Sequence, residues 1–232
     1  MSTNNLKVRI LLFRKKNSYE VEYIYKKKTP NERPMVLDVL LQAQENSIDD
    51  LSFRYGCRAR NCGVCTVEIN GKPRLACRAR VKENDLISHL STLPVVKDLI
   101  VKRDNISRQL VGFNNLANKN NLNIEADKSY HNLTACIECY ACLHNCPLHK
   151  KNDTKDILTG EKFEYGNPFS LLKLQRKYID PLTPESEKKI LLDKAIDLGL
   201  EVCKTCPGCK CGVGINLVEE VINPLLKKSY NE

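Results

Sequence analysis

Twelve cysteines carry most of the chemistry open to this chain, and they fall into three compact groups. The first group is Cys57, Cys62 and Cys65, with Cys77 following farther along the chain. The spacing C-x4-C-x2-C with a distant fourth cysteine is typical of plant-type [2Fe–2S] sites. Structural zinc is the alternative, but zinc sites favour two C-x2-C pairs, which this group lacks. The group therefore predicts a [2Fe–2S] cluster bound by all four cysteines.

The second group runs from Cys136 to Pro147 with the spacing C-x2-C-x2-C-x3-C-P. This is the run found in bacterial ferredoxins, which hold [4Fe–4S] clusters. A Rieske-type site using His144 and His149 is an alternative, but its two Cys–His pairs abut here and leave no loop to enclose a cluster. In two-cluster ferredoxins the last cysteine of the run ligates the other cluster, so the second group predicts a partner group.

The third group is that partner, and it has ferredoxin spacing at Cys203, Cys206 and Cys209. Its last member, Cys211, follows after a single residue instead of three. The cross-ligation rule of two-cluster ferredoxins then interleaves the second and third groups. The first cubane is predicted at Cys136, Cys139, Cys142 and Cys211. The third cluster is predicted at Cys146, Cys203, Cys206 and Cys209. Three clusters of four ligands account for all twelve cysteines.

Composition argues against two other classes of cysteine-rich or basic protein. A secreted disulfide protein needs an export signal, and the longest early apolar run, Ile10–Phe13, is too short for one. The formal charge of +9 suggests nucleic-acid binding. Three clusters of about −2 each would reduce that charge to about +3, which gives nucleic-acid binding little support. No apolar stretch approaches membrane-spanning length, so we expect any membrane link to come through partners.

The elements that must position the first group are β-rich. Val8–Arg14 predicts one strand, and the alternation of tyrosine or valine with glutamate in Tyr19–Tyr25 predicts a second, half-buried strand. Apolar residues at helical spacing in Val36–Leu41 predict a helix. Asn70-Gly71 is a strong two-residue hairpin signal, and this hairpin would deliver Cys77 as the fourth ligand.

The pattern changes near residue 97. Beyond it, apolar residues at helical spacing predict helices around residues 171–174, 190–198 and 217–222. We therefore expect an α+β chain with a ubiquitin-like (β-grasp) domain over residues 1–97 and a helical domain over residues 98–232.

Seven segments of the chain match motifs that occur together in one family. They are Met35–Leu40, Ser52–Arg58, Cys62–Cys65, Ile69–Cys77, Leu93–Leu99, Cys136–Pro147 and Gly214–Asn216. Together they resemble the iron–sulfur subunit of succinate dehydrogenase and fumarate reductase, the respiratory complex II family of the tricarboxylic acid cycle. The resemblance implies an N-terminal plant-type ferredoxin domain with the β-grasp fold, followed by an all-α helical ferredoxin domain.

The resemblance also implies partners. Electrons would pass between a flavoprotein subunit that holds FAD and an acceptor, usually a membrane quinone, beside membrane-anchor subunits. Succinate or fumarate chemistry would take place on the flavoprotein, so no catalytic residue is expected on this chain. It would lie on the cytoplasmic side of the cell membrane as a peripheral subunit.

The third cluster departs from the family pattern. The family usually holds a [3Fe–4S] cluster there, with two ligands in C-x5-C spacing, which Cys203 and Cys209 match. Cys206 stands where the usual member has no ligand, and its thiolate can bind a fourth iron. We therefore predict a second [4Fe–4S] cluster. The alternative is a [3Fe–4S] cluster with Cys206 as a free buried thiol.

The acceptor end departs as well, because basic residues replace the aromatic and histidine contacts that the family often uses for quinone. The candidate acceptor-side residues are Pro147, His149, Lys150, Lys151 and Lys204. This change leaves open a relative that exchanges electrons with a thiol/disulfide (heterodisulfide-type) module. An alternative function of a different class is nucleic-acid binding with clusters in a structural role, but we expect no nucleic-acid partner.

Overall fold

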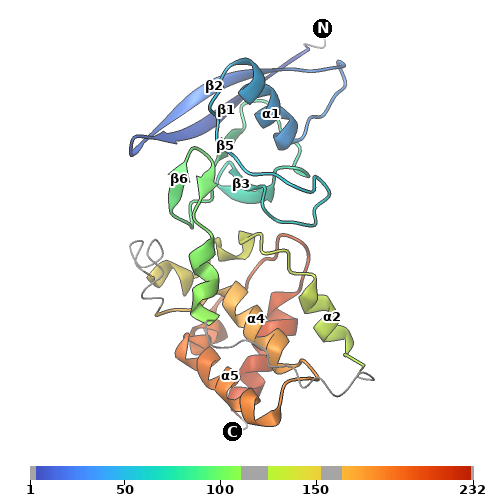
Figure 1. Cartoon of the computed structure of the whole chain (residues 1–232), viewed down its shortest axis with the longest axis vertical. Helices are drawn as coiled ribbons and strands as arrows, with labels where there is room; N and C mark the ends of the chain where they lie inside the picture. Colours follow the sequence, from blue (N-terminus) through green and yellow to red (C-terminus); the bar gives the residue numbers. More distant parts are fainter. Residues whose placement is uncertain (1–3, 111–124, 153–163, 231–232) are drawn as a thin grey trace. The chain divides into compact units, whose positions relative to one another are not determined.

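The computed structural model describes residues 4–110, 125–152 and 164–230 of the chain, which divides into two compact units. The first unit comprises Met1–Arg103 and Ile137–His144, and the second comprises Asp104–Cys136 and Asn145–Glu232. Strands dominate the first unit and helices dominate the second (Figure 1). The chain therefore combines helix and strand, as the sequence predicts. The boundary expected at residue 97 stays a prediction; Asp98–Arg103 belong to the first compact unit.

A five-stranded sheet in the order β2-β1-β5-β3-β4 forms the first unit. The long hairpin of β1 and β2 is antiparallel, and β5 runs parallel to β1 at the centre of the sheet. A two-stranded ribbon of β6 and β7 follows. The strands are β1 (Asn5–Arg14), β2 (Asn17–Lys26), β3 (Thr66–Ile69), β4 (Lys72–Leu75), β5 (Leu86–Ser88), β6 (Val95–Lys97) and β7 (Ile100–Val101).

Alternation along β1 explains the core of this unit. Every second residue of β1 is buried, while the opposite face carries Lys7 and Arg9, which pair with glutamates of β2. Helix α1 (Val36–Asn46) contacts the sheet at β2 and buries one apolar face. The buried residues of the two elements are Leu6, Val8, Ile10, Leu12, Val36, Leu37, Val39, Leu40 and Ala43. Both predicted strands and the predicted helix are confirmed.

Helices α4 and α5 pack together in the second unit through leucine-rich faces. Asn167 caps α4 by accepting a 3.0 Å hydrogen bond from the Ser170 amide, and Pro168 occupies its first position. Both features favour a helix start. The described helical segments of this unit are η1 (Asp104–Leu110), α2 (Lys128–Thr134), η3 (His149–Lys151), α4 (Pro168–Tyr178), α5 (Glu185–Asp197), η4 (Leu200–Thr205), η5 (Val218–Ile222) and α6 (Asn223–Ser229).

The predicted helix at residues 217–222 takes a different form from the other two. Segment η5 is a π-helix that runs directly into α6, whose second residue is Pro224. Proline lacks the N–H that a regular helix would use there, and a π-turn is one way in which a helix accommodates such a residue. The sequence predicts the helix but not this change of winding.

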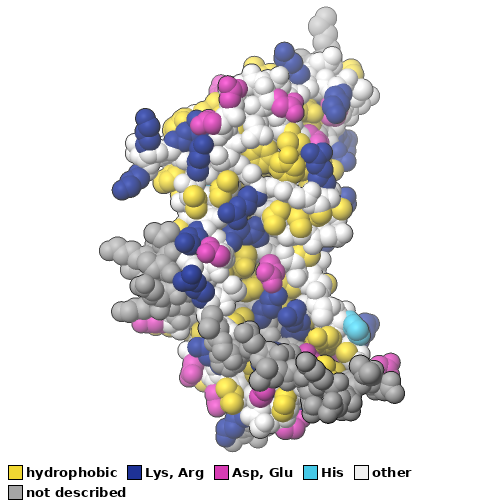
Figure 2. Space-filling view, viewed as in Figure 1, with side chains coloured by type: hydrophobic (Ala, Val, Ile, Leu, Met, Phe, Trp, Pro, Cys, Tyr) yellow, Lys and Arg dark blue, Asp and Glu magenta, His cyan; other side chains and the backbone are white. Residues whose placement is uncertain are grey.

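Charged side chains of both signs are mixed on the face shown in Figure 2, with hydrophobic side chains between them. Ion pairs such as Lys7–Glu22 and Arg9–Glu20 belong to the exposed surface of the first unit. Exposed pairs of this kind contribute about 0–1 kcal/mol each, so the fold depends on its buried cores. Within the described residues, no helix is both long enough and apolar enough to cross a membrane.

Candidate iron–sulfur sites

The loop that begins at Cys57 turns sharply so that backbone amides face the cysteine sulfur. The amides of Ala59 and Asn61 each donate to Cys57 Sγ at 3.3 Å. These two hydrogen bonds are the largest causes that lower the pKa of Cys57 to about 7, since they stabilise the thiolate. The loop reaches this shape through three left-handed residues. They are Arg58 (φ 54°), Arg60 (φ 66°) and Gly63 (φ 65°).

The β3–β4 hairpin brings Cys77, the fourth cysteine of the first group, next to Cys65 of the same group. Asn70 and Gly71 form its turn with positive φ at both residues, as the sequence predicts. The Ala76 amide donates to the Cys65 carbonyl at 3.0 Å, and the thiols of Cys65 and Cys77 are hydrogen-bonded to each other. Burial raises the pKa of Cys65 to about 11. A bound metal is what would hold both sulfurs as thiolates there.

The remaining thiol, Cys62, closes this set. Its side chain shares a hydrogen bond with Cys57, and its charge acts on Cys65. Four thiols from one loop and one hairpin therefore interact with one another, and backbone amides donate to the sulfur of the exposed Cys57. This donor set fits a sulfur-ligated cluster. No group of three or more His, Cys, Asp or Glu side chains in the described part of the chain is placed to hold a single metal ion.

A buried ion pair anchors the segment that leads into this loop. Arg14 Nε donates to Asp98 Oδ1 at 3.0 Å, and the Ser52 amide donates to Asp98 Oδ2 at 3.0 Å. The Asp98 side chain is fully buried, so removing its cationic partner would leave a buried charge uncompensated. This brace was not predicted, because Arg14 and Asp98 are 84 positions apart in the sequence.

Cys146 of the second group lies with the third group. Burial, and then the charges of Cys146 and Cys206, raise the pKa of Cys203 to about 12. Burial raises the pKa of Cys209 to about 12 as well, with the charges of Cys146, Cys203 and Cys206 acting in the same direction. The His149 amide donates to Cys146 Sγ at 3.5 Å. The four thiols predicted for the third cluster thus act on one another, and Cys206 is among them.

The set predicted for the first cubane is divided between the two units. Cys139 and Cys142 belong to the first unit, and Cys136 and Cys211 belong to the second. Cys139 is buried, and the Val213 amide donates to Cys211 Sγ at 3.4 Å. This ligand set stays a prediction.

The predicted acceptor-side residues all lie in the second unit, but they differ in exposure. The His149 side chain is only 2% exposed, so it is a buried group in this structure. Lys150 and Lys151 are exposed, and Lys151 Nζ lies 5.2 Å from the centre of the Tyr165 ring. Lys204 is exposed next to Cys203 and pairs with Glu201. Three lysines therefore lie close along the chain to Cys146 and Cys203, and two of them, Lys151 and Lys204, contact tyrosine rings.

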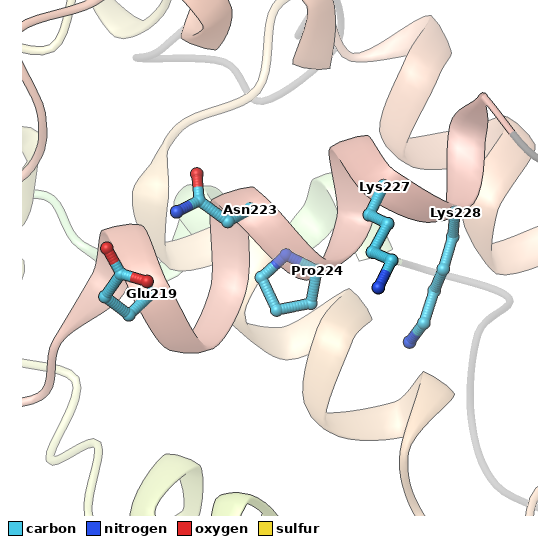
Figure 3. Close-up of a pocket in the computed structure, with 5 residues that line it drawn as sticks. All are labelled: Glu219, Asn223, Pro224, Lys227 and Lys228. Atoms are coloured by element: carbon cyan, nitrogen blue, oxygen red, sulfur yellow. The ribbon is translucent and has the colours of Figure 1, made fainter.

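A pocket of about 440 Å³ lies along η5 and α6 (Figure 3). Its lining residues are Glu219, Asn223, Pro224, Lys227 and Lys228. Burial, and then the charge of Lys188, lower the pKa of Lys228 to about 8. Lys228 Nζ also lies 3.6 Å from the centre of the Tyr178 ring, a contact that favours the charged amine. None of the predicted cluster ligands or acceptor-side residues lines this pocket.

One family model matches the chain, over residues 7–108, and it describes a 2Fe-2S iron-sulfur cluster binding domain. This stretch contains all four cysteines of the first group. The match agrees with the cofactor predicted there from spacing.

Curated relatives and a solved structure extend the likeness to most of the chain. A fumarate reductase (CoM/CoB) component from Methanothermobacter marburgensis is 31% identical over 87% of this chain, which spans only 40% of that relative's length. The mitochondrial succinate dehydrogenase [ubiquinone] iron-sulfur subunit 1 of Oryza sativa subsp. japonica is 28% identical over 81% of this chain and 69% of its own length. A chain of the Mycobacterium smegmatis Sdh1 complex in the apo form shares the fold with a TM-score of 0.79 at 21% identity, covering 99% of this chain and 97% of that one.

Proposed function

Because this chain is related in sequence to the iron–sulfur subunits of fumarate reductases and succinate dehydrogenases, we propose that it is the electron-transfer subunit of such an oxidoreductase complex. In this role it holds three iron–sulfur clusters and links an FAD-containing flavoprotein subunit to an acceptor at the membrane, with quinone as the first candidate. When bound, each cluster accepts or releases an electron, and the chain's own residues supply the thiolates, the amide donors and the spacing.

The observation that carries this proposal is the convergence of Cys146 with Cys203, Cys206 and Cys209. In a two-cluster ferredoxin, the last cysteine of one run joins the ligands of the other cluster, as Cys146 of the second group does here with the third group. A protein that used isolated structural clusters would have no reason to interleave its ligands. Interleaving supports two clusters held close together, as transfer between them requires.

The domains, clusters and location that we propose for this chain follow from the same sequence relationship. The first unit would be a plant-type ferredoxin domain of the β-grasp fold, and the second an all-α helical ferredoxin domain, divided near residue 97. Their sites would be a [2Fe–2S] cluster and two [4Fe–4S] clusters, with the ligands predicted above. Anchor subunits would hold the chain as a peripheral protein on the cytoplasmic side of the cell membrane.

Purification of the affinity-tagged chain from its native host, without oxygen, tests this role. We expect a flavoprotein subunit with bound FAD to co-elute, and addition of succinate or reduced electron donor to change the cluster spectrum. Recovery of the cluster-loaded chain without any flavoprotein, or in complex with nucleic acid that survives moderate salt, would contradict the proposal.

A thiol/disulfide couple on a separate module is the second candidate acceptor. Two observations favour it: the fourth thiol, Cys206, in the third set, and a relative named for CoM/CoB instead of a quinone. Reoxidation of the reduced native complex distinguishes the two candidates. Faster reoxidation by a soluble quinone supports the first candidate, and faster reoxidation by a disulfide supports the second.

A further inference from the structure

Two cysteine-bearing loops of the first unit approach each other closely at Gly63. Gly63 lies between Cys62 and Cys65, and a Cβ on it would sit 2.2 Å from the Ile137 carbonyl oxygen and 3.0 Å from the Cys139 amide nitrogen. Its φ of +65° also favours glycine. The backbone of the [2Fe–2S] loop is therefore in direct contact with the backbone that carries a predicted ligand of the first cubane.

Arg103 bridges the same two loops with its guanidinium group. Its Nη1 donates to the Val64 carbonyl at 3.0 Å, and its Nη2 donates to the Gly63 carbonyl at 3.2 Å. Nη2 also donates to the Glu138 carbonyl. The guanidinium carbon lies 4.9 Å from the centre of the Tyr140 ring. One side chain thus contacts the residues on both sides of Cys139 and two residues between Cys62 and Cys65.

The type of side chain matters at this position. A planar guanidinium directs several N–H groups at once, whereas a lysine ammonium offers a compact charge without that fork. The hydrogen-bond partners are carbonyl oxygens, so the positive charge is not neutralised by them. Glu138 and Tyr140 both hold left-handed backbone, with φ of 53° and 58°. Backbone of this kind persists only where surrounding contacts hold it in place.

We propose that Arg103 is a positioning residue that fixes the spacing between the [2Fe–2S] loop and the Cys139 loop, and so sets the electronic coupling between the two clusters these loops bind. This inference rests on the proposed electron-transfer function. Because electron exchange between clusters depends steeply on their separation, a small loosening of either loop would slow it. The positive charge of Arg103 has a second effect, since a cation beside a cluster favours the reduced, more negative form of that cluster.

Three variants separate these effects in the full-length, cluster-loaded chain. Arg103→Gln removes the charge and most of the fork, and Arg103→Lys keeps the charge alone. Arg74→Gln is the matched control, since Arg74 is exposed on β4 and donates to the carbonyl of the adjacent Pro73. The measurements are hydrogen exchange of the amides at residues 137–140, the midpoint potentials of the clusters, and spin–spin broadening in the EPR spectrum of the fully reduced protein.

Arg103→Gln should speed exchange at residues 137–140 severalfold, weaken the spin–spin broadening and lower the midpoint potentials. Arg103→Lys should keep the potentials near those of the unmodified chain while losing part of the protection and broadening, and Arg74→Gln should change none of them. Should Arg103→Gln fail to fold, the contrast between Arg103→Lys and Arg74→Gln decides. If every variant bound its clusters and showed unchanged hydrogen exchange and spin–spin broadening, the inference about Arg103 would be overturned and the proposed function would stand. An unmodified chain that binds no clusters would overturn the proposed function instead.

Discussion

In the proposed third cluster, Cys206 is the residue that distinguishes a [4Fe–4S] from a [3Fe–4S] cluster. Its charge acts on Cys203 and Cys209, and Cys146 faces the same set, so a thiolate at Cys206 is placed to bind a fourth iron. The C-x5-C pair formed by Cys203 and Cys209 suffices for three irons together with Cys146. The difference between a [3Fe–4S] and a [4Fe–4S] cluster therefore reduces to one side chain.

Cys206→Ser should convert the third cluster to a [3Fe–4S] cluster and raise its reduction potential. A serine hydroxyl does not supply a thiolate, so the fourth iron would lose its soft ligand. EPR of the oxidised protein measures the change, because a [3Fe–4S] cluster is paramagnetic when oxidised. Thr205→Ala, at the exposed neighbouring position, should leave the spectrum unaltered. A [3Fe–4S] signal of equal size before and after the Cys206→Ser substitution would make Cys206 a bystander.

The ligand sets predicted for the cysteines rest on local spacing, which a sequence displays directly. Residues that act through long-range contacts are different. Asp98 pairs with Arg14, and Arg103 reaches carbonyls at Gly63 and Glu138, yet nothing near these residues in the sequence marks such partners. Their roles depend on how the sheet and the cysteine loops come together, which a single sequence does not state.

Among the elements, the loop that contains Gly63 packs tightly against another cysteine segment. An alanine there would place its Cβ against the Ile137 carbonyl and would also strain a left-handed backbone. Gly71 offers a matched control, because its φ is +73° but nothing lies within 4 Å of the position of a Cβ.

Gly63→Ala should reduce the iron retained by the purified chain and lower its thermal midpoint, whereas Gly71→Ala should cost only about 1–2 kcal/mol of stability for the strained φ. Iron content per chain and thermal unfolding, measured side by side, give the comparison. Equal losses in the two variants would mean that strain alone, and not the contact with residues 137–139, limits the substitution.

Element prediction succeeded where periodicity was strong. The β1 and β2 alternation, the apolar face of α1 and the Asn70-Gly71 hairpin could all be predicted. The π-helical winding of η5 could not, because apolar spacing does not distinguish an α-turn from a π-turn. His149 shows the same limit for single side chains, since a histidine next to lysines gives no sign that it will be 2% exposed.

At the scale of the whole molecule, the two compact units are not simple successive stretches of chain. Residues 137–144 belong with the strand-rich first unit, although they follow Asp104–Cys136 of the second. This exchange places Cys139 and Cys142 in the unit that contains the loop of the first cysteine group, and leaves Cys146 in the same unit as the third group. A composition change near residue 97 cannot reveal such a return of the chain.

The cluster inventory of the intact chain tests the central claim most directly. Iron and acid-labile sulfide should be measured per chain in protein purified without oxygen, together with EPR of the reduced and oxidised forms. We expect about ten irons, as one two-iron and two four-iron clusters, with three separate one-electron centres. Stoichiometric zinc in place of iron, or about two irons with the second and third cysteine groups reduced and metal-free, would contradict the proposed electron-transfer role.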